Sequence, residues 1–98
     1  MSYSLRYRPE VVRDLDEASR WYGNRRNGLG VEFLEECKAA LGRVEENPER
    51  VAADAQGIRS MRISRFPYVI HYRIEGQTIV IFGIMFGGRD PSEWHGRV

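Results

Sequence analysis

Hydrophobic and polar residues alternate at the start of the chain, and the spacing then becomes helical. Tyr3, Leu5 and Tyr7 alternate with polar side chains, which predicts a first strand over residues 3–8. Pro9 ends this strand and suits the first turn of a helix that continues to about residue 26. A loop rich in Gly and Asn precedes a second helix, expected from about residue 29 to residue 46. The buried faces are expected to consist of Val11, Leu15, Ala18 and Tyr22 in the first helix and of Leu34, Cys37, Leu41 and Val44 in the second.

The second half of the chain has the patterns of strands. One strand is predicted over residues 58–63 and another over residues 68–74, with Pro67 between them. Residues 75–77 have the composition of a short hairpin turn. Residues 78–86 are nearly all apolar, which is typical of a strand that is central in its sheet or buried on both faces. A short C-terminal tail follows, in which Asp90 and Pro91 favour a turn.

This order of elements, β-α-α-β-β-β, predicts an α+β fold in a single domain over residues 1–98. The sheet should be mainly antiparallel, with a helical hairpin packed on one face and a short C-terminal tail. Two helices cover one face of such a sheet. The other face is therefore expected to stay accessible and to carry Arg and Tyr side chains.

The composition excludes several classes of protein. The net charge of +1 gives no overall electrostatic case for nucleic-acid binding. We found no apolar run near the roughly 18 residues of a membrane span and no signal-peptide core, so a cytoplasmic protein is expected. Cys37, the one cysteine, falls on a buried helical face and is expected to be a core thiol. The sequence has no Cys/His cluster and no phosphate-binding loop, so no metal or organic cofactor is implied.

The segment RFPYVIHYRIEGQTIVIFGIMFGGRDPSEW, residues 65–94, together with the order of elements, resembles the RelE/ParE superfamily. These proteins are the bacterial toxins of type II toxin–antitoxin modules and are often labelled plasmid stabilisation proteins. The resemblance implies that Pro67 lies in the turn before the third strand. It also implies a cognate antitoxin, whose disordered tail would fold along the helical hairpin and the sheet edge. A homodimer and a toxin–antitoxin hetero-oligomer both remain open.

The resemblance leaves the target open. RelE-like members are ribosome-dependent mRNA endoribonucleases, whereas ParE-like members inhibit DNA gyrase and are not known to be enzymes. Of the cationic and proton-transfer residues of the ribonuclease branch, this chain has partial counterparts in Arg62, Arg89 and His95. Val69 stands where that branch typically has an Arg, and losing such a contact commonly costs 10² to 10³ in rate. We therefore favour the ParE-like branch, with a RelE-like ribonuclease and a non-toxic member that regulates its own operon as alternatives.

The residues expected to contact the target are exposed Arg and aromatic side chains on the sheet and the tail. Strand parity would place Arg59 and Arg65 on one face and Arg62 on the other, unless a bulge re-aims one of them. The plainer structural interpretation is that Arg62 solvates an edge strand and that Arg89 pairs with a carboxylate to hold the tail. His71 is expected to be a packed or half-exposed strand residue. The target-binding candidates are Arg59, Arg62, Arg65, Tyr72, Arg89 and Trp94.

Overall fold

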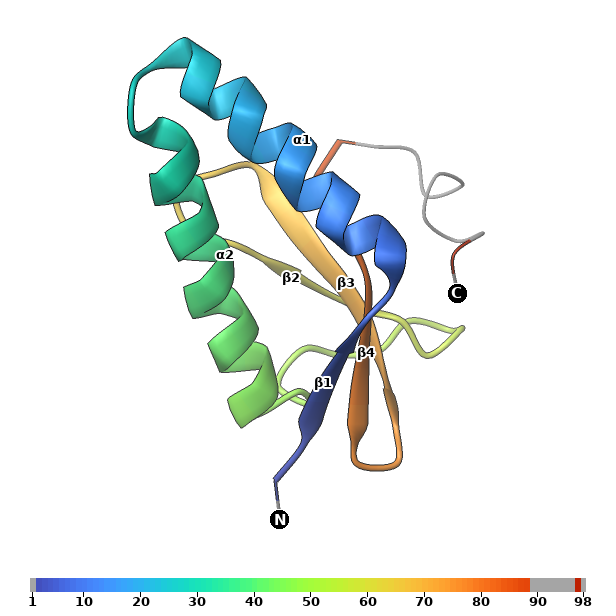
Figure 1. Cartoon of the computed structure of the whole chain (residues 1–98). Coiled ribbons are helices and arrows are strands. Elements are labelled where there is room, and N and C mark those ends of the chain that lie inside the picture. The colour runs from blue at the N-terminus through green and yellow to red at the C-terminus, as the bar shows by residue number, and fades with distance from the viewer. Residues whose placement is uncertain (1, 89–96, 98) are drawn as a thin grey trace.

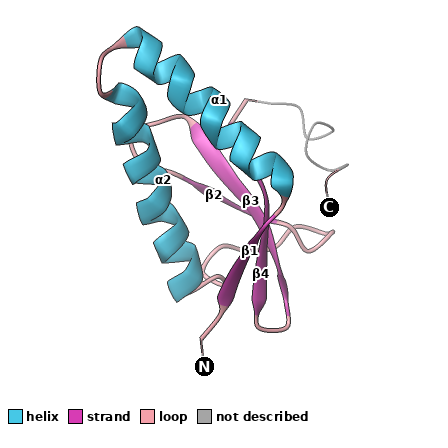
Figure 2. Cartoon of the chain, viewed as in Figure 1, coloured by secondary structure: helices cyan, strands magenta, loops and turns pink. Residues whose placement is uncertain are grey.

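A computed structural model describes residues 2–88 and residue 97 of the chain. The order of elements is the one predicted, and a helical hairpin lies across a four-stranded sheet (Figures 1 and 2). The second helix has the expected bounds, and Pro9 is the first residue of the first helix, where its missing N–H leaves no bond unmade. The elements are β1 Ser4–Tyr7, α1 Pro9–Arg25, α2 Leu29–Glu46, β2 Arg59–Arg62, β3 Tyr68–Glu75 and β4 Thr78–Phe86.

The four strands form one sheet in the order β1-β4-β3-β2. The pairs β2–β3 and β3–β4 are antiparallel, and β1 runs parallel to β4. The apolar strand β4 therefore lies inside the sheet, as the unbroken run of apolar residues predicted. Neither α1 nor α2 has the length and apolar character that a membrane crossing requires, and these are the helices of the described chain.

A bulge in β4 explains why its apolar run does not alternate. Tyr72 pairs with Ile81 and His71 pairs with Gly83, so Phe82 is an extra residue in β4. The bulge changes the parity of the strand. Ile81 and Ile84, three residues apart, both join the core beneath the helices. Phe82 and Met85 instead form a second buried cluster with Ile58, and this cluster corrects the expectation that the face away from the helices is open throughout.

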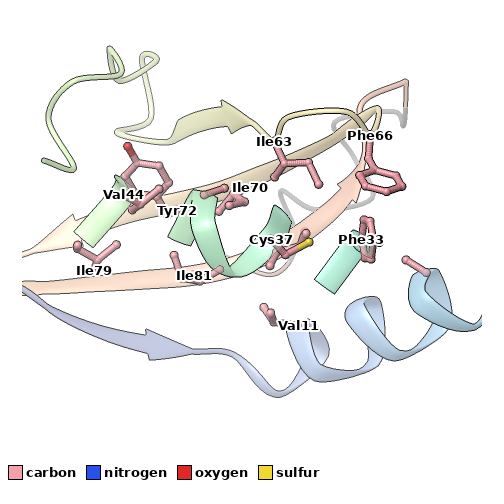
Figure 3. Close-up of a cluster of buried hydrophobic side chains, with 13 residues drawn as sticks. Val11, Phe33, Cys37, Val44, Ile63, Phe66, Ile70, Tyr72, Ile79 and Ile81 are labelled. Atoms are coloured by element: carbon pink, nitrogen blue, oxygen red, sulfur yellow. The ribbon is translucent and has the colours of Figure 1, made fainter. Parts of the chain in front are cut away.

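The main core lies between the helical hairpin and the sheet (Figure 3). Cys37 is buried in it, and burial raises the pKa of its thiol to about 12, which confirms the expected core thiol. The predicted stripe of α2 is partly wrong, because Leu34 is 41% exposed and Leu41 is half-buried. The buried face of α2 is made instead of Gly30, Phe33, Cys37, Ala40 and Val44.

Gly30 is the reason for this rotation of α2. A Cβ atom built on Gly30 would lie 2.3 Å from the backbone oxygen of Ser19 in α1. The two helices can approach this closely only where α2 presents a residue without a side chain. The face of α2 that contains Gly30 must therefore point at α1 and the sheet, and Leu34 is turned outward.

Candidate functional site

The arginine row of the second strand does not converge on one site. Arg59 pairs with Tyr72 and Arg62 pairs with Val69 in the β2–β3 ladder, so their side chains lie on opposite faces, as parity predicted. Arg59 is half-buried and donates through Nη1 to the backbone oxygens of Val51 and Glu49. Its guanidinium therefore holds the loop before β2.

Arg65 ties the β2–β3 turn to the second helix. It has a left-handed backbone, with φ of 70°, and its guanidinium lies 2.7 Å from a Glu32 oxygen and 3.6 Å from a Glu36 oxygen. Glu32 also accepts hydrogen bonds from Arg26, at 3.1 and 3.2 Å. The hydrogen bonds from Arg65 and then from Arg26 hold the pKa of the Glu32 carboxyl below its ordinary value. Arg65 therefore stabilises the fold by linking the β2–β3 turn to α2.

Tyr72 is not on an accessible face, and this expectation was wrong. Tyr72 is fully buried beneath the helices, and its hydroxyl donates to the backbone oxygen of Pro48 at 2.7 Å. The side chains of Tyr68, Ile70 and Tyr72 alternate onto the face that the helical hairpin covers. Burial raises the pKa of the Tyr72 hydroxyl, which keeps it a neutral donor.

Arg62 keeps the character expected of a binding residue. It is exposed on the face away from the helices, and its side chain makes no hydrogen bond or ion pair with any described residue. On the same face His71 is 7% exposed, and its Nδ1 lies 2.8 Å from the hydroxyl oxygen of Ser60, which confirms the expected packed strand residue. The residues singled out in the C-terminal tail lie outside the described residues: Arg89, Asp90, Pro91, Trp94 and His95.

A groove runs along the helical hairpin, and the sequence did not predict it. Two adjoining hollows of about 340 and 260 Å³ share Leu34 as a wall. The first lies between β1 and the two helices, and the second extends to the hairpin tip beside Gly30. Among the residues that line this hairpin groove, Tyr7 is 44% exposed and Val31 is 63% exposed. The residues that line the hairpin groove include Leu5, Tyr7, Leu15, Leu34, Leu41 and Glu45 toward β1, and Ser19, Arg20, Gly23, Val31 and Leu34 toward the tip.

The free edge of β1 adjoins this groove. Within the described sheet β1 pairs with β4 alone, so its other side has no neighbouring strand. Leu5 and Tyr7 of β1 are also walls of the groove. An extended segment beside β1 could therefore bond to the strand backbone while a preceding or following turn of helix fills the groove.

Beyond the end of β1, side chains bond to the backbone of β4. The Asp14 carboxylate accepts a hydrogen bond from the Ile84 N–H at 3.3 Å and forms an ion pair with Arg97 at 2.7 Å. Arg97 also donates to the backbone oxygen of Phe82 at 3.3 Å. Asp14 and Arg97, which we call the edge clamp, are 83 residues apart and were not singled out from the sequence.

A further hollow of about 520 Å³ lies between α1, the start of β3 and the end of β4. Four of its ten wall residues are aromatic, and we call it the aromatic pocket. Trp21, on its rim, is 52% exposed, and Phe86 is 47% exposed. The residues that line it include Asp14, Glu17, Trp21, Tyr22, Tyr68 and Phe86.

Comparison with known proteins agrees with this architecture. Residues 5–91 match the family described as the ParE toxin of the type II toxin–antitoxin system, parDE. The fold is similar to that of a solved structure titled "Chromosomal ParDE TA system from P. aeruginosa", with a TM-score of 0.74 and 19% sequence identity over 87% of this chain and 96% of that chain. No curated protein matches the sequence. Because the family match covers most of the sequence, the chain belongs to the ParE toxin family of type II toxin–antitoxin systems.

Proposed function

We propose that this chain is a gyrase-inhibiting toxin that its cognate antitoxin neutralises in the bacterial cytoplasm. It would act as one domain over residues 1–98, as a homodimer or in a toxin–antitoxin hetero-oligomer. Membership of the ParE family supports a toxin with an antitoxin partner. The observation that carries the antitoxin part of the proposal is the hairpin groove, an apolar channel beside an unpaired strand edge, and the gyrase target rests on family membership.

The groove suits a disordered antitoxin tail that folds as it binds. Leu34 and Val31 are large apolar residues that α2 leaves exposed to solvent, whereas Phe33 on the same helix is buried in the core. A helix laid in the groove would remove these side chains from water, which is the usual driving force for coupled folding. The β1 edge offers backbone groups to an extended part of the same tail.

A supercoiling assay tests the target. Purified toxin should inhibit supercoiling by DNA gyrase, and equimolar antitoxin should restore it. Leu34→Glu should weaken the binding of the antitoxin without changing the inhibition of gyrase, because it places a charge in the groove and not in the core. Val12→Glu is the matched control, since Val12 is 68% exposed on α1 and does not line the groove. Normal supercoiling at saturating wild-type toxin would refute the gyrase assignment.

One observation favours the ribonuclease alternative. Arg62 is exposed and has no partner among the described residues, as a side chain that binds phosphate would require. Val69, directly opposite Arg62 in the ladder, offers no charge to assist it. Cleavage of translated messages in a purified translation system, abolished by Arg62→Ala, would establish that activity in place of gyrase inhibition.

A further inference from the structure

The aromatic pocket lies on a different side of α1 from the hairpin groove. Asp14, Glu17 and Trp21 recur at helical spacing and line the pocket. Leu15, by contrast, lines the groove, as does Ser19. A partner that occupies the pocket therefore uses a different surface from a partner that occupies the groove.

Four aromatic residues line the pocket in a connected row. The ring of Trp21 meets that of Tyr22 edge-on at 5.0 Å. Tyr22 lies 6.0 Å from Tyr68, and Tyr68 lies 6.2 Å from Phe86. The faces of such rings carry partial negative charge, so a pocket walled by them attracts cations as well as apolar groups.

The pocket also contains two carboxylates in different states. Asp14 is half-buried and already bonded to Arg97 and to the Ile84 N–H. Glu17 is exposed, and its carboxylate makes no hydrogen bond or ion pair with any described residue. One negative charge in the aromatic pocket is therefore without a partner in the described chain.

The chain's own arginines show both contacts that this pocket can make. The guanidinium carbon of Arg25 lies 4.2 Å from the centre of the Trp21 ring, which is cation–π geometry. Arg97 meets the Asp14 carboxylate through both Nη atoms, at 2.7 and 3.3 Å. A second guanidinium or ammonium group can make the same two kinds of contact with Glu17 and the exposed ring of Phe86.

We propose that the aromatic pocket binds an arginine or lysine side chain of the toxin's protein target. The pocket is then the target site, and the hairpin groove is the antitoxin site. A nucleic-acid target is disfavoured here, because the unpaired Glu17 carboxylate repels phosphates. This inference rests on the proposed function only in taking the partner to be the toxin's target.

The test compares two pocket variants with one control. Glu17→Gln removes the unpaired charge and keeps the shape of the side chain. Phe86→Leu keeps an apolar side chain and removes the exposed π face. Glu35→Gln is the control, since Glu35 is an exposed acid on α2 that lines none of the three hollows and has no described partner.

Three properties are measured for each variant: growth arrest on induced expression, inhibition of purified DNA gyrase, and affinity for the antitoxin. We expect Glu17→Gln and Phe86→Leu to inhibit gyrase about tenfold more weakly and to arrest growth less. Antitoxin affinity and melting temperature should stay at the wild-type values, and Glu35→Gln should match wild type throughout.

Each of the other outcomes contradicts one part of the proposal. Wild-type activity in Glu17→Gln overturns the proposal, and full activity in Phe86→Leu shows an apolar and not a cationic occupant. Equal losses of antitoxin affinity and toxicity reassign the pocket to the antitoxin, while a lowered melting temperature assigns Glu17 to the fold. If wild-type toxin arrests growth without inhibiting gyrase, the gyrase assignment fails and growth arrest by the variants still judges the pocket. A wild-type chain with neither activity overturns both.

Discussion

The contact between Gly30 and Ser19 makes a sharp prediction about stability. Gly30→Ala places a methyl group 2.3 Å from the Ser19 backbone oxygen, whereas real Cβ contacts stay above 3.0 Å. The shortfall is 3.0 − 2.3, or 0.7 Å, and the obstructing atom is helix backbone that cannot rotate away. The helices must separate at this end of the hairpin.

Two opposing contributions to the free energy of unfolding have known sizes. Overpacking of this kind costs typically about 1–3 kcal/mol. The better helix propensity of Ala offsets up to about 1 kcal/mol of that cost. Because the obstructing atom is helix backbone, the cost lies toward the upper end of its range. We therefore expect a net loss of about 1–2 kcal/mol, which lowers the melting temperature of a domain of this size by roughly 4–16 °C.

Gly42 supplies the matched control on the same helix. A Cβ on Gly42 meets no atom within 4 Å, so Gly42→Ala gains propensity without a clash. It should stabilise the fold by roughly 0.5–1 kcal/mol. Thermal unfolding followed by circular dichroism measures both variants. If Gly30→Ala melts at or above the wild-type temperature, or if both variants shift in the same direction, the close helix contact and the resulting rotation of α2 are refuted.

Three further predictions concern single side chains. Tyr72→Phe removes the hydroxyl bonded to the Pro48 carbonyl and should cost about 1 kcal/mol in urea unfolding; an unchanged midpoint would contradict this bond. The Cys37 thiol, with its pKa raised to about 12, should react with a thiol reagent at pH 8 only as fast as the protein opens, and rapid labelling of the folded protein would show that the thiol is accessible. The pKa of Glu32 is lowered by its arginine partners, so its stabilising contribution is complete above the ordinary glutamate pKa and is lost as the pH falls through the lowered value. The melting temperatures of wild type and Glu32→Gln should therefore converge in acid, and a gap that widens there would reverse the sign of this interaction.

The sequence predicted the elements well because their boundaries depend on local chemistry. Pro9 and the Asn47-Pro48 pair mark helix ends through backbone restrictions that act within one or two residues. The unbroken apolar run likewise indicated that β4 is internal. These signals are local, so no knowledge of the packing was needed to interpret them.

The errors arose where packing between distant segments decides the outcome. The rotation of α2 depends on how closely Gly30 approaches Ser19, which no periodicity within α2 reveals. Val31, Leu34 and Leu41 recur at helical spacing, and this second apolar stripe was the one available signal for the hairpin groove. The aromatic pocket brings residues 14–22 together with residues 67–86, so its existence depends on the tertiary fold.

The edge clamp has a consequence for self-association. Beyond the end of β1, the adjoining edge of β4 would otherwise have unpaired backbone N–H and C=O groups. Such an edge can pair with strands from other copies and start aggregation. Asp14 occupies the Ile84 N–H and Arg97 occupies the Phe82 carbonyl, so a passing strand finds these groups already bonded. A strand from another copy must first displace this ion pair before it can bond to β4. The edge clamp therefore opposes aggregation as well as holding the fold together.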